Sequence, residues 1–194
     1  MFIDFVFPED NEEELLEVAE KLGTKELCFV YIELPEDLMS RLSGFKSRHK
    51  TKLYFGNLLQ SMGKKKKKIS TDFVLAESND PGETRKLLEQ KKADIIYGME
   101  FHSRKDYMHQ LDSGLNHVLA KIAKENNVSF GFSLFRYNSL GRPQKVKVLA
   151  RLLQNIRLYN KYKLRLKLFS GTGDAFGLAA ETEIKAMLNV LKYK

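Results

Sequence analysis

The chain has 194 residues, of which 43% are hydrophobic, and a formal net charge of +8. This size and apolar content suit one packed core, so we expect a single domain over residues 1–194. The single cysteine, Cys28, excludes a disulfide framework, no Cys/His cluster has zinc-ligand spacing, and no apolar run approaches the roughly 20 residues of a membrane span. The beginning of the chain lacks a basic region followed by a long apolar stretch, so we expect a cytoplasmic protein that does not bind membranes.

Mainly apolar runs recur along the chain and predict buried strands, because a strand that is covered on both faces is apolar almost throughout. The runs are at residues 2–7, 27–32, 52–55, 73–76, 95–99, 128–134 and 164–169.

Helical patterns separate these runs. Asn11 is expected to cap a first helix that Gly23 ends, and Pro81 suits the first turn of another. Asp112 or Ser113 is expected to cap a helix with an apolar stripe over residues 115–123.

Pro143 opens a long helix, and the chain ends with another helical pattern over residues 184–191. The side chains of the long helix expected to face the core are those of Val146, Leu149, Leu152, Leu153, Ile156 and Tyr159. Strands that alternate with helices indicate an α/β fold with a mainly parallel sheet. Periodicity alone does not separate an open sheet from a closed barrel, although an eight-unit barrel typically needs about 250 residues.

Residues 113–121 read SGLNHVLAK, and Ala123 and the Gly-Phe-Ser sequence at 131–133 follow. This pattern resembles the family of archaeal ribonuclease P protein component 3, to which a subunit of eukaryotic nuclear ribonuclease P and MRP also belongs. The resemblance implies a compact, irregular (β/α) TIM-like barrel with about seven mainly parallel strands, related to the polymerase-and-histidinol-phosphatase hydrolases. Asn116 and His117 could have a role of their own in the family, or could simply cap or bridge backbone groups.

Metal-dependent barrels of this kind open with Asp-x-His-x-His, whereas this chain has Asp4, Val6 and Pro8 at the corresponding positions. Four further polar side chains lie near predicted strand ends, where barrel active sites form: Glu33, Glu77, Glu100 and His102. They could bind one ion, but with both family histidines absent we expect no metal site and no catalytic residue. The SGTG segment at 170–173 could cradle a phosphate or form an ordinary turn.

Positive charge is concentrated in two segments. Residues 38–71 and 126–173 each contain ten Lys or Arg and no Asp or Glu. Such segregation favours a basic surface for a polyanion, although segments separated in sequence can also interleave in space and cancel. Five consecutive lysines at 64–68 are expected to form a solvated loop that attracts phosphates, or a loop without a function.

The expected RNA-contacting residues lie in loops or on exposed helix faces. They are Arg104, Lys121, Arg136, Arg142, Lys145, Lys147, Arg151 and Arg157, with Lys64, Lys65, Lys66, Lys67 and Lys68. Arg151 has apolar neighbours and could instead support its helix. The chain departs from the family at residues 175–180, which are apolar where relatives usually carry basic residues.

The resemblance implies a protein subunit of ribonuclease P, the endoribonuclease that removes 5′ leaders from precursor tRNA. In that family the RNA subunit and its Mg²⁺ ions are the catalyst, so the protein is expected to bind no cofactor and not to be catalytic on its own. The implied partners are the catalytic RNA, precursor tRNA and a small ferredoxin-like protein subunit. Two alternatives stay open, namely a divergent metal-dependent phosphoesterase and a general RNA-binding assembly protein.

Overall fold

The computed structural model describes residues 2–33, 44–45, 48–59, 71–106 and 111–193. The lysines at 64–68 and His109 lie outside these residues.

The sheet contains seven strands, and each predicted strand run is confirmed. They are β1 (Asp4–Val6), β2 (Glu26–Tyr31), β3 (Lys52–Leu59), β4 (Phe73–Glu77), β5 (Ile95–Tyr97), β6 (Ser129–Ser133) and β7 (Leu166–Phe169). Each strand pairs in parallel with the next one along the chain, in the order β1 to β7.

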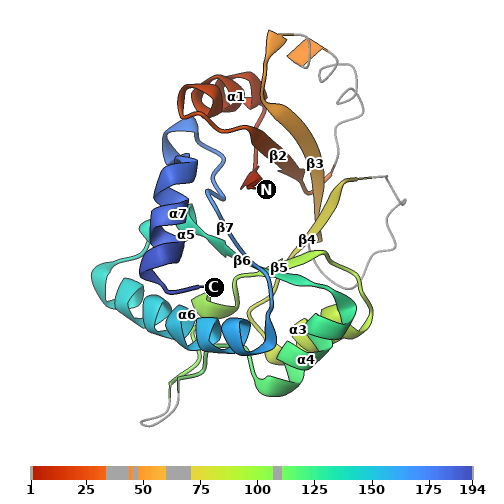
Figure 1. The fold of residues 1–194 in the computed structure, drawn as a ribbon, viewed down its shortest axis with the longest axis vertical. Helices are drawn as coiled ribbons and strands as arrows, with labels where there is room; N and C mark the ends of the chain where they lie inside the picture. The colour runs from red at the N-terminus through yellow and green to blue at the C-terminus, as the bar shows by residue number, and fades with distance from the viewer. Residues whose placement is uncertain (1, 34–43, 46–47, 60–70, 107–110, 194) are drawn as a thin grey trace.

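The two outer strands meet beyond the end of β7. The Gly171 amide donates to the Phe5 carbonyl over 2.9 Å, and the Phe7 amide donates to the Thr172 carbonyl over 2.8 Å. These bonds bring the carboxyl end of β1 to the segment after β7, so the sheet curls into a nearly closed barrel (Figure 1). The compact, irregular TIM-like barrel is therefore confirmed.

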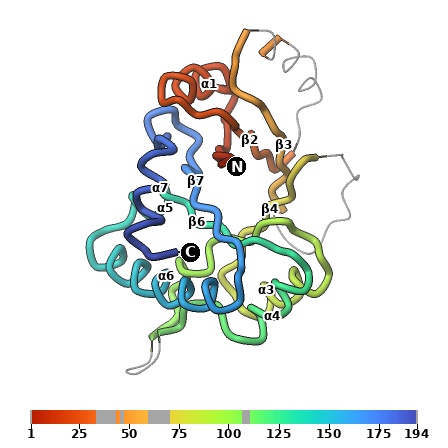
Figure 2. The backbone as a smooth tube through the Cα atoms, viewed as in Figure 1, coloured from red at the N-terminus to blue at the C-terminus, as the bar shows by residue number. Residues whose placement is uncertain are grey.

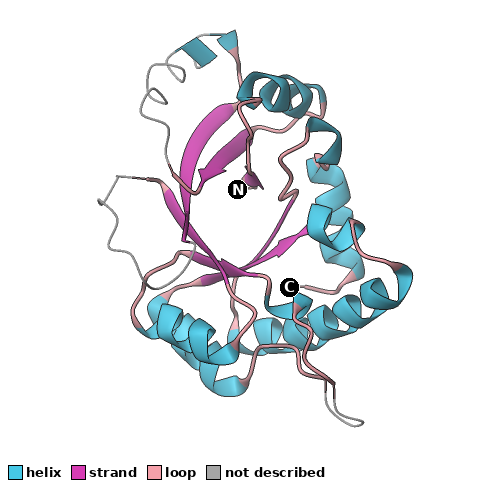
Figure 3. Ribbon diagram, turned by 180° about the vertical axis from the view of Figure 1, so that it is seen from behind, coloured by secondary structure: helices cyan, strands magenta, loops and turns pink. Residues whose placement is uncertain are grey.

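The helices lie outside the ring of strands, as Figure 3 shows from behind and Figure 2 shows for the backbone alone. They are α1 (Glu12–Lys21), α3 (Pro81–Glu89), α4 (His117–Asn126), α5 (Leu134–Asn138), α6 (Arg142–Tyr162) and α7 (Glu181–Val190), with short 3₁₀ turns η1 (Met99–Phe101) and η2 (Ala175–Gly177). No helix of the described residues combines the length and apolarity needed to cross a lipid bilayer.

The signals for helix ends are confirmed at Pro81 and Gly23. Pro81 is the first residue of α3, whose first turn is capped by the Asp80 carboxylate. Gly23 follows α1 with φ at +75°, a backbone conformation that favours glycine. Asn11 stands at the start of α1, but its side chain accepts from the Glu9 amide and makes no cap bond to the helix.

Aromatic rings fill the interior of the barrel. The ring centroid of Phe5 lies 5.4 Å from that of Phe73 and 5.6 Å from that of Phe169. The ring centroids of Tyr97 and Phe169 are also 5.6 Å apart, and all three pairs are edge-to-face. Cys28 is fully buried in the same cluster, which confirms its expected place in the core. Side chains of the strands therefore pack together in the interior of the barrel.

The predicted core face of α6 is partly wrong. Val146 is 69% exposed and Leu153 is 42% exposed. The helix buries a narrower stripe that includes Leu152 and Ile156, and polar Arg151 and Asn155 occupy the rest of the buried face. Apolar periodicity could not show that polar residues take part of this face.

Candidate nucleic-acid interface

In metal-dependent barrels of this kind, the end of the first strand carries metal ligands. In this chain Asp4, at the corresponding position, makes a contact that closes the barrel. The Asp4 carboxylate accepts from the Ser170 amide over 2.7 Å and from the Ser170 hydroxyl over 2.6 Å. Burial raises the pKa of Asp4 to about 6. Its neighbour Val6 packs in the apolar cluster beneath α1. Both side chains therefore have a structural role that joins the first strand to its surroundings.

The four polar residues near strand ends do not converge. Glu77 forms an ion pair with Arg136, and Glu33 is exposed. Glu100 is buried and accepts from the Asn155 amide group over 2.8 Å, while burial raises its pKa to about 7. Within the described ranges, no group of three or more His, Cys, Asp or Glu residues is placed to hold a metal ion.

His102 has partners for both ring nitrogens. Its Nε2 lies 2.6 Å from the Asp112 carbonyl, and its Nδ1 lies 3.1 Å from the Arg104 amide. Because the Arg104 amide is a donor, Nδ1 accepts and Nε2 carries the proton, which is the neutral form of the ring. Burial of the ring lowers the pKa of His102, in agreement with this assignment. His102 thus holds the loop before α4 in place.

Two carboxylates organise the same loop. Asp112 binds the Arg104 guanidinium over 2.6 Å, and Asp106 accepts from the Asp112 amide over 2.9 Å. Asp106 also pairs with Lys147 over 3.3 Å and with Arg151 over 3.0 Å, both on α6. Arg104 and Lys147, both predicted to contact RNA, therefore form ion pairs with carboxylates of the chain itself, and these pairs partly neutralise their charge.

Arg151 supports the fold instead of facing solvent. Its side chain is 1% exposed, and its guanidinium donates to the carbonyls of Glu100, His102 and Arg104 over 2.8–3.0 Å, in addition to Asp106. The prediction of an RNA contact here is corrected, because the group has no donor directed toward solvent. The alternative, support of the helix, agrees with the geometry.

The family-like run at 113–121 builds the start of α4. Gly114 has φ at +80°, and a Cβ at this position would lie 2.9 Å from the Met99 carbonyl oxygen. The Asn116 side chain caps the helix by accepting from the Val118 and Leu119 amides, each over 2.9 Å. The prediction that Asp112 or Ser113 caps this helix is therefore wrong.

Asn116 thus has the capping role left open by the sequence, and His117 joins two helices. The His117 Nδ1 atom lies 3.1 Å from the Tyr162 hydroxyl at the end of α6. Lys121 follows His117 by one helical turn and is exposed. Arg157 and Lys161 are likewise exposed and one turn apart on α6. We use the name α4–α6 surface for the two residues that join these helices, His117 and Tyr162, together with the exposed cations of the two helices, Lys121, Arg157 and Lys161.

The remaining predicted cations do not share one surface. Lys145 lies 5.8 Å from the Tyr137 ring of α5, whereas Lys147 reaches Asp106 in the loop before α4, so the two occupy opposite edges of α6. Arg136 lies 4.7 Å from the Phe101 ring besides its pair with Glu77.

Three predicted cations, Lys121, Arg142 and Arg157, are exposed and make no ion pair with any residue that the structure describes. Sequence reasoning missed Lys161, whose ammonium lies 5.7 Å from the Tyr162 ring. The signal that could have identified it is the adjacent Lys-Tyr pair at the end of a basic helix. These exposed cations are available to phosphate without the loss of an internal partner.

The SGTG segment is a structural turn. The Ser170 amide donates to Asp4, and the Gly171 amide donates to Phe5, so neither group is available to a phosphate. These two amides close the barrel, which agrees with the ordinary-turn alternative.

No family model matches the chain. Among curated proteins, it is 23% identical to ribonuclease P protein component 3 of Methanococcus maripaludis (strain C6) over 82% of this chain and 68% of the relative. It is 25% identical to the protein of that name from Methanococcus vannielii over 94% of this chain and 69% of the relative. With the one from Methanosarcina barkeri it shares 30% identity, over 84% of this chain and 57% of the relative. The sequence resemblance to ribonuclease P protein component 3 is confirmed.

Solved structures agree on the fold. A chain in a cryo-EM structure of archaeal ribonuclease P with mature tRNA matches with a TM-score of 0.80 and 20% identity, over 97% of this chain and 82% of that one. A prolidase complexed with N-methylphosphonate-L-proline matches with a TM-score of 0.56 and 9% identity, over 98% of this chain and 69% of that one. The likeness in fold to the first of these structures thus extends along nearly the whole chain.

Proposed function

We propose that the chain is a protein subunit of ribonuclease P and acts in the removal of 5′ leaders from precursor tRNA. The observation that carries this proposal is the structural use of the family-like run at 113–121. That run builds a helix junction and presents the exposed Lys121 one turn from the His117–Tyr162 contact with α6, the helix that carries the exposed Arg157 and Lys161. The similarity to ribonuclease P protein component 3 over most of the chain supports the same role.

The physical contribution of the protein would be fixed positive charge. The cations of the α4–α6 surface stand on helices whose other faces are packed in the core. Such charges reduce the repulsion between RNA phosphates that folding brings together, and they are held in position by the barrel. Catalysis is left to the RNA subunit with its own Mg²⁺, and the protein contributes no cofactor.

The partners we propose are the catalytic RNA, precursor tRNA and a small ferredoxin-like protein subunit, and the proposed location is the cytoplasm. A phosphoesterase is less well supported, for two reasons. The Asp4 carboxylate accepts a hydrogen bond from the Ser170 hydroxyl, and aromatic rings fill the barrel interior where a substrate would bind. A general RNA-binding protein would also have exposed cations, but that function does not explain the 113–121 run.

Sequencing the RNA that co-purifies with the full chain from native extract tests the proposal. We expect one abundant structured RNA together with precursor tRNA, and precursor cleavage by the purified particle. Removing RNA by nuclease treatment should abolish cleavage, since the protein alone supplies no catalytic group. A broad mixture of RNAs without cleavage would instead support a general RNA-binding protein, and cleavage that survives the nuclease would support an enzyme.

A further inference from the structure

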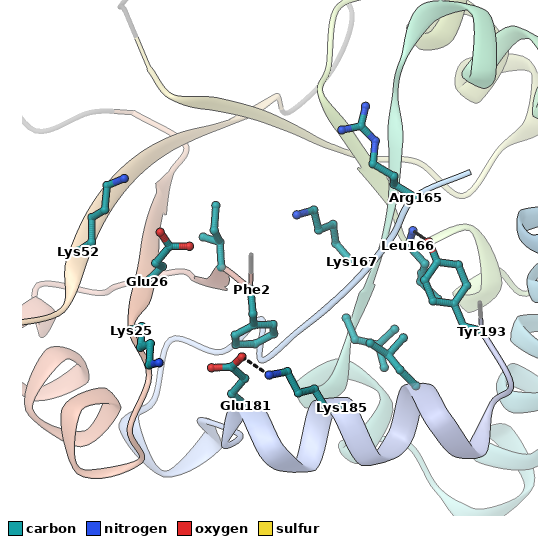
Figure 4. A pocket seen from close by; sticks show the side chains of 13 residues that line it. Phe2, Lys25, Glu26, Lys52, Arg165, Leu166, Lys167, Glu181, Lys185 and Tyr193 are labelled. Atoms are coloured by element: carbon teal, nitrogen blue, oxygen red, sulfur yellow. Dashed lines mark hydrogen bonds and ion pairs between the residues drawn. The ribbon is translucent and has the colours of Figure 1, made fainter. Parts of the chain in front are cut away.

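A cavity of about 620 Å³ opens at the amino ends of the strands, on the face opposite the contacts that close the barrel. It lies between the beginnings of β1, β2, β3 and β7, with α7 along one side (Figure 4). Bonds of the Phe5–Phe7 segment to Gly171 and Thr172 join β1 to the chain beyond β7, and no ladder pairs the two strands among the described residues. The opening follows from this one-ended closure.

Positive charge dominates the lining of the cavity. Its five cations are Lys25, Lys52, Arg165, Lys167 and Lys185, against the two carboxylates of Glu26 and Glu181. Glu181 pairs with Lys185 over 2.6 Å, and Glu26 accepts from the Tyr54 hydroxyl over 3.2 Å.

Lys25 and Lys167 form no ion pair with any residue within the described part of the chain. Partial burial, and then the nearby charge of Arg165, lower the pKa of Lys167, against a smaller opposite effect of the Glu26 carboxylate. The ammonium of Lys167 therefore stands in a partly enclosed space with its charge incompletely balanced. An anionic ligand would relieve this imbalance.

The floor of the cavity is apolar. Phe2, Leu166 and Leu188 line it together with Tyr193, whose hydroxyl accepts from the Leu166 amide and donates to the Leu164 carbonyl over 2.9 and 2.8 Å. Figure 4 shows the Phe2 ring between Lys25 and Lys167. An aromatic and aliphatic floor beside unbalanced lysines matches the two halves of a nucleotide, namely a flat base and a phosphate.

We infer that this amino-terminal cavity receives a nucleotide of single-stranded RNA, with the phosphate near Lys25 and Lys167 and the base against Phe2. A paired base is stacked inside its helix and cannot enter a concave site, so the ligand is an unpaired segment. The inference rests on the proposed function in taking RNA as the ligand. Its residues do not overlap the α4–α6 surface, so it adds a second contact with a different preference.

The test measures binding of a fluorescein-labelled single-stranded oligouridylate to the full-length protein. The Lys25→Ala/Lys167→Ala variant should bind about tenfold more weakly, and its salt slope should fall by about 0.7, because one phosphate is no longer neutralised. The matched control is Lys86→Ala/Lys92→Ala, which removes two exposed lysines that do not line the cavity. The control should bind as the wild type, and thermal melting should show that both variants are folded.

Two further measurements decide the ligand. Phe2→Ala should weaken oligouridylate binding, whereas a blunt-ended, fully paired RNA duplex should bind the wild type and Phe2→Ala equally. Equal losses in the two lysine double variants would overturn the inference, because binding would then follow net charge alone. Competition by free uridine monophosphate at the same concentration as the oligomer would also overturn it and assign the cavity to a mononucleotide.

The inference and the proposed function can fail separately. Cavity-dependent binding of the oligomer without a co-purifying ribonuclease P RNA would retain the cavity as a site and reject the subunit role. An active ribonuclease P particle that is unaffected by the cavity variants, together with unchanged oligomer binding, would reject the cavity and retain the subunit role.

Discussion

Glu100 is a buried acid whose hydrogen bonding is incomplete. Its Oε2 atom, the Asn155 Oδ1 atom and the Tyr159 hydroxyl are all buried without a hydrogen-bond partner in the described structure. Burial raises the pKa of Glu100 to about 7 from 4.5, against the opposing effect of the Asn155 bond. The folded protein therefore favours the protonated acid, whereas the unfolded chain ionises at lower pH.

This difference gives a defined pH dependence. A raised folded-state pKa stabilises the protein fully below about 4.5, and that stability is lost as the pH rises through about 7. Glu100→Gln keeps a neutral group of the same shape. The free energy of unfolding of the wild type should therefore fall relative to the variant between pH 5 and 8, by up to about 3 kcal/mol. Chemical denaturation at several pH values measures it.

The control for this experiment is Glu17→Gln on α1, since Glu17 is exposed. That variant should follow the wild type at every pH. The raised pKa of Asp4 also acts on the wild type and on both variants alike, so it cancels in the comparison. If Glu100→Gln and the wild type lose stability in parallel, Glu100 is not the acid that titrates.

At the scale of elements, the two faces of α6 place their arginines in different environments. Arg151 lies on its buried face and holds three backbone carbonyls and Asp106, while Arg157 lies on its exposed face. Arg151→Met should lower the free energy of unfolding by about 3–5 kcal/mol, because it leaves a buried acceptor network unpaired. Arg157→Met should change it by less than about 0.5 kcal/mol and should weaken RNA binding. Denaturation and RNA titration on both variants measure these effects, and the reverse pattern would show that the two roles are exchanged.

The sequence predicted the strands well and the polar contacts of α6 poorly, for a physical reason. A buried strand is apolar throughout, so each run such as 128–134 reports its own environment. Arg151 instead depends on carbonyls about 50 residues earlier in the chain, and local spacing contains no information on them. Asn116 stands out in the sequence as unusual, but its capping role required the actual start of α4.

The same distinction explains the candidate site. Exposed cations such as Lys121 and Arg157 were predicted because a helix periodicity separates the two faces. The pairing of Arg104 with Asp112 and of Lys147 with Asp106 was not, because it needs a folded loop. The cavity at the amino ends was not predicted either, since its lysines come from positions as distant as 25 and 185.

At the scale of the whole molecule, the chain carries two kinds of positive charge. Some cations stand on helices whose other faces are packed in the core, and five consecutive lysines occur at 64–68, outside the described residues. Replacing residues 64–68 with serine should lower affinity for any RNA and flatten its salt dependence, by up to about 0.7–0.9 for each phosphate that is no longer neutralised.

Replacing Arg142, Lys145 and Lys147 with glutamine should impair cleavage by the assembled enzyme more than bulk RNA binding. Titrations over a range of salt and cleavage assays on the same preparations measure both. Loss of assembled activity in the lysine-run variant alone would place the functional charge outside the helices.

The last prediction concerns the assembled particle. Folded RNA brings phosphates together, and Mg²⁺ or protein cations can reduce their repulsion. Reconstituting the catalytic RNA with this chain and its proposed small partner should therefore lower the Mg²⁺ concentration at half-maximal cleavage. A variant with glutamine in place of Lys121, Arg157 and Lys161 should move that midpoint back toward the value for RNA alone, while Lys86→Gln/Lys92→Gln should not. A midpoint that stays unchanged although binding is confirmed would mean that the protein does not act through fixed charge, and that its contribution lies in holding its partner or the substrate.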